Sequence, residues 1–340
     1  MLRVLKNSAL RMARDLGVLE TVAGSRWRQQ RLLILGYHGL SLKDEDRWSN
    51  LFITPAFFYS RLALLRRRRY RVLPLNDGLR MLREGNLPSR SVVITFDDGF
   101  HDFHQIGFPM LREFEFPATV YQTTYYSDHP FPIFNLVLSY ILWRASGRRL
   151  DGGAYGVPGV FDLSDSGHRN RALQAFRELA RRRRCTAAEK DAIASRIAAE
   201  LGVDYPEILR LRMLQLMTAS QISAIAAAGI DVQLHTHRHR APLDNQLFVR
   251  EIRDNRQWLA ARTGKLPNHF CYPSGYHRDE FLPWLRSEEI VSATTCDHGM
   301  ADRTCEPLRL PRLLDSMNVS EVDFEGWLAG VSSVLPHRPV

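Results

Sequence analysis

Four short polar segments contain residues that bind metal ions or transfer protons, and each follows an apolar run. Active sites of parallel α/β proteins collect at the C-terminal ends of strands. Four polar strand ends in one chain therefore indicate an active site. The segments are residues 37–39 (Tyr-His-Gly), 97–99 (Asp-Asp-Gly), 235–239 (His-Thr-His-Arg-His) and 272–275 (Tyr-Pro-Ser-Gly).

The histidine-rich segment 235–239 has the spacing of metal ligands. His235 and His239 are four residues apart, so they would share one face of a helical turn. If the segment is extended, His235, His237 and His239 point to the same side instead. Both conformations keep His235 and His239 together, which makes this pair the candidate. The alternative is a solvated histidine-rich loop.

A divalent metal bound by such a pair usually takes a carboxylate or a third histidine as well. Asp97 and Asp98 offer that carboxylate. Adjacent residues on a strand point to opposite sides, so the two aspartates should have different roles. One would bind the metal while the other accepts a proton. The alternative is a turn or a helix cap, because Asp before Gly is a common turn signal.

Apolar runs alternate with helical patterns at intervals of roughly 25–40 residues, which indicates a parallel sheet covered by helices. Thr54 and Pro55 predict the start of one helix, and Gly264 predicts the end of another. The alternation stops between about 127 and 217, where Gly-rich sequence precedes two polar helices. We interpret this region as an insertion that forms a lid or recognises substrate.

Composition narrows the classes of protein further. The chain has 340 residues, of which 45% are hydrophobic, enough for one large domain or two smaller ones. The net charge is +9, but only four of the 46 basic residues are lysine. This bias favours solvated arginines over a nucleic-acid site, so no nucleic-acid partner is expected. The four cysteines include no C-x-x-C pair, which indicates free thiols in a reducing compartment.

Residues 1–30 predict a basic amphipathic helix, which could lie on an anionic membrane surface or pack on the domain. We find neither a secretory signal nor an apolar stretch of ~18 residues. The expectation is a cytoplasmic protein, with peripheral contact at the inner membrane face as one alternative. The expected division is this helix, a catalytic domain at 31–330 and a tail at 331–340.

Three of the motifs together resemble a known family. TFDDG, HTHRH and YPSG, in this order, are similar to the motifs of the polysaccharide deacetylases of carbohydrate esterase family 4. The resemblance extends over about residues 31–315, apart from the insertion. It implies a distorted (β/α)7 barrel. It also implies a metal-dependent hydrolase that removes N-acetyl groups from an amino-sugar polysaccharide, oligosaccharide or lipid-linked precursor and releases acetate.

The resemblance also implies roles for the motif residues. Asp97 would be the general base, and a divalent metal, usually zinc in this family, would polarise the N-acetyl carbonyl. The oxyanion would be stabilised by this metal and by a backbone N–H of the turn after the third motif strand. The implied metal ligands are Asp98, His235 and His239, and the oxyanion or substrate set is Tyr272, Pro273 and Ser274, with Arg312 added to it.

Two departures from the family pattern concern the candidate site residues. The usual Leu-x-Ile-His motif near the C-terminus is missing, but "LGYH" ends at His38 and resembles the permuted order of the poly-N-acetylglucosamine deacetylases. His38 is therefore our candidate for the general acid, with a core histidine as the alternative. The arginine that often precedes the third motif is also missing. Arg312 is the candidate to replace it and orient Asp97.

Two other classes of protein stay open. A glycoside hydrolase would use Asp97 and Asp98, but its carboxylates must flank the scissile bond at ~5–9.5 Å, which neighbouring residues seldom achieve. A catalytically silent glycan-binding module would bind sugar without releasing acetate. The sequence leaves open the exact sugar and the oligomeric state.

Overall fold

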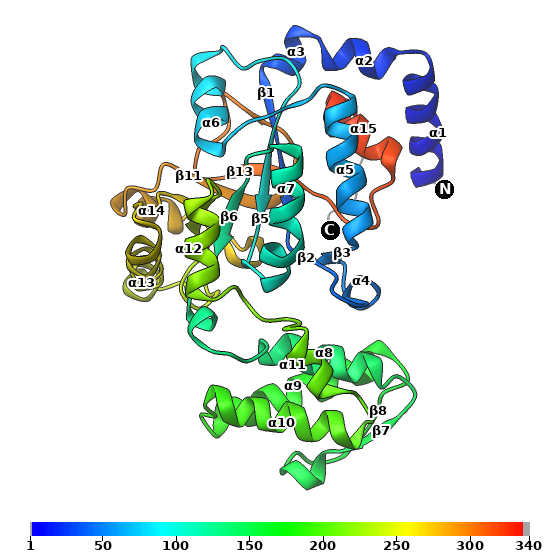
Figure 1. Cartoon of the computed structure of the whole chain (residues 1–340), viewed down its shortest axis with the longest axis vertical. Coiled ribbons are helices and arrows are strands. Elements are labelled where there is room, and N and C mark those ends of the chain that lie inside the picture. The colour runs from blue at the N-terminus through cyan, green and yellow to red at the C-terminus, as the bar shows by residue number, and fades with distance from the viewer. Residues whose placement is uncertain (1, 336–340) are drawn as a thin grey trace.

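A computed structural model describes residues 2–335, and its centre is a closed barrel of parallel strands (Figure 1). The order around the barrel is β1-β13-β11-β10-β9-β6-β5, and pairing of β1 with β5 closes it. The predicted (β/α)7 barrel is therefore confirmed. The strands are β1 (Arg31–Tyr37), β5 (Ser91–Phe96), β6 (Thr119–Gln122), β9 (Asp231–Leu234), β10 (His269–Cys271), β11 (Ser292–His298) and β13 (Leu310–Leu314).

Short strands extend the barrel at its edges. β4 (Arg71–Val72) pairs with the first residues of β5, and β12 (Ala301–Asp302) pairs antiparallel with the start of β1. β2 (Gly39–Leu40) and β3 (Phe52–Ile53) form a separate parallel pair beyond β1. These additions lengthen the sheet without interrupting the closed ring.

Helices cover the outside of the barrel, and their ends follow local sequence signals. Thr54 caps α5 by accepting a hydrogen bond from the Phe57 amide at 3.1 Å, as predicted. Gly264 ends α13 at φ 67°, a left-handed conformation that favours glycine. The helical elements are α4 (Glu45–Trp48), α5 (Pro55–Arg67), α6 (Leu75–Glu84), the π-turn η1 (Phe103–Gly107) with α7 (Phe108–Phe114), α12 (Ala219–Ala227), α13 (Asn245–Thr263), η4 (Pro273–Gly275), α14 (Phe281–Ser287), α15 (Glu321–Ala329) and η5 (Val331–Val334).

The N-terminal region forms three helices rather than the single one expected: α1 (Leu2–Asp15), α2 (Val18–Ala23) and α3 (Arg26–Gln29). Helix α1 packs on α15, where Leu10 is buried and the Lys6 ammonium lies 2.9 Å from Asp323. Contact of this region with a membrane stays a prediction. Within residues 2–335, no helix has the length and apolar character needed to cross a bilayer.

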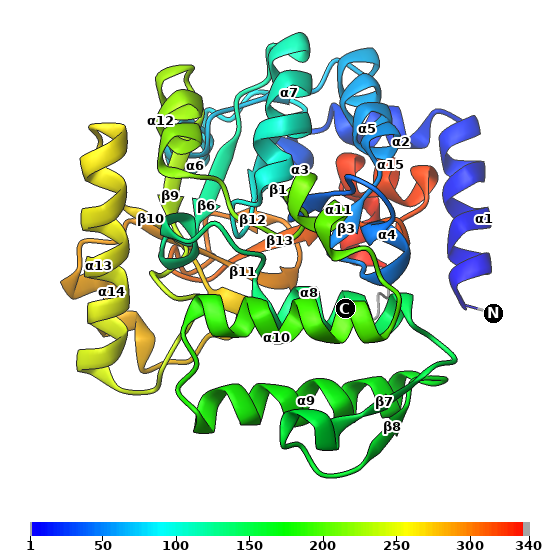
Figure 2. The same ribbon diagram turned by 60° about the horizontal axis from the view of Figure 1, so that its bottom comes forward.

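The insertion forms a helical unit beside the barrel (Figures 1 and 2). Both predicted helices are present, as α9 and α10, but the sequence reasoning missed α8, whose apolar residues fill the insertion's own core. That core is a cluster distinct from the barrel core. The elements are η2 (Tyr125–Asp128), α8 (Phe134–Arg144), β7 (Arg149–Asp151), η3 (Gly152–Tyr155), β8 (Val160–Asp162), α9 (Ser166–Arg182), α10 (Ala187–Glu200) and α11 (Tyr205–Arg210).

A buried ion pair ties the first helix of the barrel to its last strand. The Arg61 guanidinium donates to Asp315 at 2.9 and 3.2 Å, and the Tyr37 hydroxyl donates to the same carboxylate at 3.0 Å. Burial raises the pKa of Asp315 although Arg61 opposes the change. Removing one member would leave a charge buried without its partner.

We expect Arg61→Met to lower the free energy of unfolding by about 3–5 kcal/mol, because Asp315 would lose its counter-charge inside the protein. Arg67→Met, on the same helix, removes an exposed pair with Glu321 at 3.8 Å and should change stability little. Urea denaturation of both variants measures this difference. Equal effects of the two substitutions would contradict the assignment.

Candidate active site

The first of the paired aspartates is held by an arginine inside the barrel. The two oxygens of Asp97, which follows β5, accept hydrogen bonds from the Arg312 guanidinium at 2.8 and 2.7 Å. Arg312 comes from β13, and it also donates to the Thr95 hydroxyl and the Thr295 carbonyl. Both members of the pair are buried, with Arg312 fully so. The two-point contact fixes the orientation of the carboxylate.

This pair also controls the charge of Asp97. Burial alone would raise the pKa of the carboxyl group, but the positive charge and hydrogen bonds of Arg312, with smaller contributions from His38 and His235, lower it to about 2. Asp97 is therefore ionised at neutral pH and can accept a proton.

The side chains of Asp97 and Asp98 point in different directions because the backbone turns between them, and not because they alternate along a strand. Strand β5 ends at Phe96, before either aspartate, so the expected alternation along a strand is wrong. Asp98 has φ 66° and Gly99 has φ 79°, both left-handed. A Cβ on Gly99 would lie 1.9 Å from Oε1 of Gln122, so only glycine fits there. The turn aims the two carboxylates at different partners.

Those partners are the predicted histidines. Oδ1 of Asp98 lies 3.2 Å from Nε2 of His235 and 3.2 Å from Nε2 of His239. The segment 235–239 is neither helical nor extended, because Thr236 and His239 adopt left-handed conformations. The helical turn and the extended segment considered from the sequence are therefore both wrong, although His235 and His239 do lie together. Thr236 steadies the loop by accepting a hydrogen bond from the Arg240 amide at 3.0 Å.

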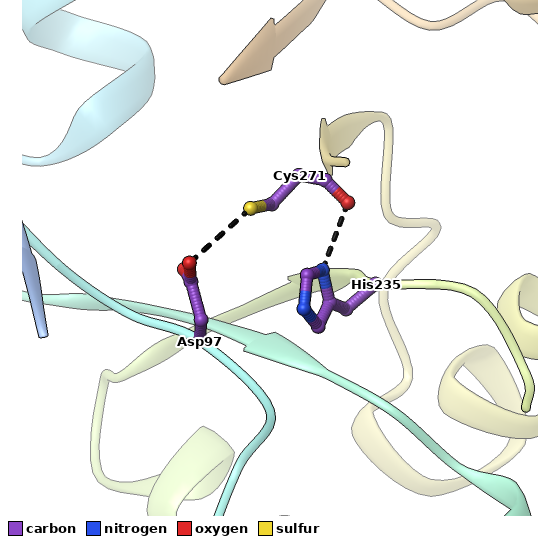
Figure 3. A group of neighbouring side chains, drawn as sticks. All are labelled: Asp97, His235 and Cys271. Atoms are coloured by element: carbon purple, nitrogen blue, oxygen red, sulfur yellow. Dashed lines mark hydrogen bonds between the residues drawn. The ribbon is translucent and has the colours of Figure 1, made fainter. Parts of the chain in front are cut away.

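The ring of His235 is oriented by its surroundings (Figure 3). Its Nδ1 lies 2.8 Å from the Cys271 carbonyl oxygen, which can only accept, so Nδ1 carries a proton and Nε2 is the nitrogen that faces Asp98. The His235 amide donates to the side chain of Asn255 at 3.0 Å. Asn255 is a supporting residue that the sequence reasoning missed, because nothing local links α13 to this loop.

The donor set of Asp98, His235 and His239 fits a divalent cation. Their ligand atoms lie within 4.8 Å of one another, and the two O–N separations are 3.2 Å. Ligands at the usual ~2.0–2.1 Å from a tetrahedral ion would be about 3.3–3.4 Å apart. Two imidazoles and one carboxylate suit zinc and related transition metals. The fit supports the metal site expected from the sequence.

A second group, Asp97 with His235 and Cys271, also lies within 4.8 Å. It is less suited to a metal, because both oxygens of Asp97 are bonded to Arg312. Burial also raises the pKa of the Cys271 thiol, which keeps it protonated. Its Sγ lies 3.4 Å from Oδ2 of Asp97 and 3.3 Å from Nη2 of Arg312 (Figure 3). Cys271 thus packs against the ion pair of Asp97 and Arg312. In the sequence, the feature that could have pointed to Cys271 is its position directly before Tyr272 of the third motif.

The candidate acid lies beside the candidate base. Nε2 of His38, at the end of β1, is 3.7 Å from Oδ2 of Asp97. Burial lowers the pKa of His38 below its usual 6.5, although Asp97 and Asp98 oppose this change. His38 is partly exposed, with 18% of its side chain accessible, so it is placed at the edge of the site rather than in the core.

The third predicted motif forms the turn after β10. Tyr272 is fully buried, and its hydroxyl donates to the Leu308 carbonyl at 2.9 Å. Its amide donates to Thr294, and Pro273 has no amide hydrogen. Ser274, which is exposed, has φ 56° at the tip of the turn. Arg312 is too deeply buried to contact substrate, so its place is with Asp97 and not with this turn.

Comparisons with known proteins agree with this geometry. The sequence profile of the polysaccharide deacetylase family matches residues 185–291. The poly-β-1,6-N-acetyl-D-glucosamine N-deacetylase of Staphylococcus epidermidis is 26% identical over 110 residues, or 29% of this chain. The match covers 38% of that protein's length. The matched segment includes His235 and His239 but not Asp97 and Asp98.

Solved structures share the fold over most of the chain. Streptococcus pyogenes deacetylase PplD, in complex with acetate, gives a TM-score of 0.58 at 17% identity and covers 90% of this chain and 99% of its own. IcaB from Ammonifex degensii gives a TM-score of 0.55 at 17% identity, and the match covers 88% of this chain and 97% of IcaB. A de-N-acetylase from Aggregatibacter actinomycetemcomitans gives a TM-score of 0.56 at 13% identity, and the match covers 87% of this chain and 99% of that protein. These likenesses establish the fold alone.

The barrel is of the same kind as that of the solved deacetylases above. In sequence, the segment 185–291 is similar to the polysaccharide deacetylase family, and the match spans little more than a third of the curated relative's length.

We expect the purified protein to bind one zinc ion per chain. Asp98→Asn should weaken this binding by more than about 100-fold, because it removes the carboxylate that faces both histidines. Isothermal titration with zinc measures the change. His237→Gln is the control, since Nδ1 of His237 lies 2.8 Å from the Thr124 hydroxyl and not on Asp98. Equal loss in both variants would place the metal elsewhere.

Proposed function

We propose that this protein removes N-acetyl groups from an amino-sugar glycan and releases acetate, with the help of a divalent metal. The observation that carries the proposal is the division of the adjacent aspartates. Asp97 is held ionised by Arg312, while Asp98 faces two imidazole nitrogens at 3.2 Å. A base and a metal site side by side are what amide hydrolysis by water requires.

The cation would be held by Asp98, His235 and His239, and zinc is proposed because it is usual in the family. When bound, it supplies Lewis acidity that polarises the substrate carbonyl and makes water more acidic. Asp97 is assigned the role of general base that takes the proton of the attacking water. Within the turn after β10, we assign the oxyanion donor to the Ser274 amide, because the Tyr272 amide is already bonded to Thr294.

His38 is assigned the role of general acid. Its lowered pKa makes its protonated form a stronger acid than an ordinary imidazolium, which helps it protonate the departing amine. The same shift keeps His38 neutral at neutral pH until it receives a proton. Asp97, whose Oδ2 lies 3.7 Å from Nε2 of His38, gains a proton when water adds to the carbonyl. Transfer of this proton from Asp97 to His38 returns Asp97 to its ionised form. His38 then donates the proton to the leaving amine.

The rival functions fit the site less well. A glycoside hydrolase needs two free carboxylates, but Asp97 is bonded to Arg312 and Asp98 faces the histidines. A silent glycan-binding module has no use for a base that is oriented at two points and kept ionised. The substrate is proposed to be an N-acetylated polysaccharide, oligosaccharide or lipid-linked precursor.

We expect acetate release from a panel of N-acetylated amino-sugar oligosaccharides, abolished by a chelator and restored by zinc. Asp97→Asn should lower kcat by about 10²–10⁴-fold, because it removes the base and leaves the metal ligands in place. Asp297→Asn, an exposed aspartate paired with His277, is the control and should keep wild-type activity. Undiminished acetate release by Asp97→Asn would exclude its role as base.

Arg312→Lys tests orientation separately from chemistry. A lysine keeps the positive charge but cannot make the two parallel hydrogen bonds, so kcat should fall roughly 10–100-fold with little change in KM. Because Arg312 lowers the pKa of Asp97, the substitution should raise the pKa of Asp97. On acidification, the variant should therefore lose activity at a higher pH than the wild type does. A pH profile of kcat/KM with an unchanged acid limb would refute this dependence.

A further inference from the structure

A large cavity lies between the barrel mouth and the insertion, next to the proposed catalytic residues but lined by none of them. Its volume is about 680 Å³, within the range of about 300–1,000 Å³ typical of ligand pockets. The barrel side contributes Tyr125, Tyr126 and Arg240. The insertion contributes residues of α9, of α10 and of the turn between them, among them Arg177, Arg184 and Lys190.

The cavity wall carries positive charge without matching negative charge. Among residues 2–335, no carboxylate lies within ion-pair distance of four lining cations: Arg177, Arg184, Lys190 and Arg240. The lining carboxylate Glu178 accepts hydrogen bonds from Arg181 at 2.8 and 2.7 Å, so it is already neutralised. Cations that face one cavity repel one another, and an anionic ligand would relieve the repulsion.

Backbone contacts join this cavity to the proposed metal site. Arg240 directly follows His239, and its amide donates to the Thr236 hydroxyl at 3.0 Å. The Tyr125 amide donates to the His237 carbonyl at 2.7 Å, and the two rings meet edge to face at 5.7 Å. A ligand in the cavity therefore lies beside the loop that carries both histidines.

Aromatic side chains complete the barrel side of the wall. Tyr125 is exposed at 38%, and Tyr126 and Phe131 are partly exposed beside it. Aromatic faces and edges pack against the apolar faces of sugar rings, while the tyrosine hydroxyls offer hydrogen bonds. Aromatic residues next to cations suit a sugar that carries acidic groups better than a neutral sugar or a simple anion.

We propose that this cavity binds the acidic groups, phosphate or carboxylate, of an anionic glycan whose N-acetylated sugar reaches the neighbouring metal site. The inference rests on the proposed deacetylase function and narrows its substrate to acidic amino-sugar glycans. The insertion, rather than the barrel, then selects the substrate.

The test compares binding of three probes to the zinc-loaded full-length protein by isothermal titration at low salt. The neutral probe is chitotetraose, the carboxylate probe is a hyaluronan tetrasaccharide, and the phosphate probe is N-acetylglucosamine 1-phosphate. At least one acidic probe should bind roughly tenfold tighter than chitotetraose, and added salt should weaken it. The acidic probe that binds tighter identifies the chemical source of the charge.

A pair of double variants locates the binding. Arg177→Gln with Arg184→Gln removes two cavity cations and should weaken the acidic probe roughly three- to tenfold, with chitotetraose unaffected. Arg171→Gln with Arg183→Gln removes two arginines from the same helical segment outside the cavity lining. This control should leave the binding of the acidic probe and of chitotetraose unchanged. Equal weakening by both double variants, or no preference of the wild type for an acidic probe, would overturn the proposal.

Acetate release separates this proposal from the proposed function. Charge-selective binding that depends on Arg177 and Arg184, without acetate release from any probe or oligosaccharide, would refute the deacetylase and leave an acidic-glycan site. Acetate release from neutral oligosaccharides without charge selectivity would support the deacetylase and refute the cavity's role.

Discussion

The chemistry of the site depends on one buried ion pair, between Asp97, which follows β5, and Arg312 on β13. A carboxylate inside a barrel would normally be driven to its neutral form, and a neutral acid cannot serve as a base. The guanidinium reverses this by binding both oxygens at 2.7–2.8 Å. Its own position is fixed by the Thr95 hydroxyl and the Thr295 carbonyl. Residues of three barrel strands, β5, β11 and β13, thereby hold a single charge in one orientation.

That pair also allows two adjacent aspartates to be ionised together. Neighbouring carboxylates with a common environment repel each other, and one of them usually takes a proton. Here the left-handed turn at Asp98 and Gly99 sends each to a different source of positive charge. Burial disfavours the charge on Asp98, yet His239 and His235 hold its pKa well below the usual value. A short sequence motif therefore yields two functions because the backbone turns between them.

Local patterns in the sequence were enough to predict a parallel sheet covered by helices and the polar residues at its strand ends, whereas the seven-stranded barrel was expected from the family resemblance. Apolar runs and caps such as Thr54 depend on nearby residues, and parallel strands bring their C-terminal ends together wherever the loops lead. The conformation of segment 235–239 could not be read in this way. The loop is held by distant groups, because the Arg238 amide and guanidinium both donate to Glu251 of α13.

The same limit applies to the arginine and to the insertion. The pairing of Arg312 with Asp97 spans 215 positions, and Arg312 was named as a candidate for it only because the arginine usual in the family is missing. No local signal shows that a β13 residue reaches the place beside Cys271. Helix α8 was missed because its sequence has apolar residues on every face, so no one-sided stripe stands out.

The basic run at 181–184 illustrates what composition can and cannot decide. Solvated helix ends were expected there, and Arg181 does pair with Glu178 on an exposed face. Arg181 and Arg184 both line the cavity, but within residues 2–335 only Arg181 has a carboxylate partner there. An excess of arginine over the whole chain says nothing about where unpaired charge collects. The fold decides this, because α9 and α10 meet the loops that follow β6 and β9. The barrel strands can then keep rigid catalytic geometry while a separate core carries the residues that choose the substrate.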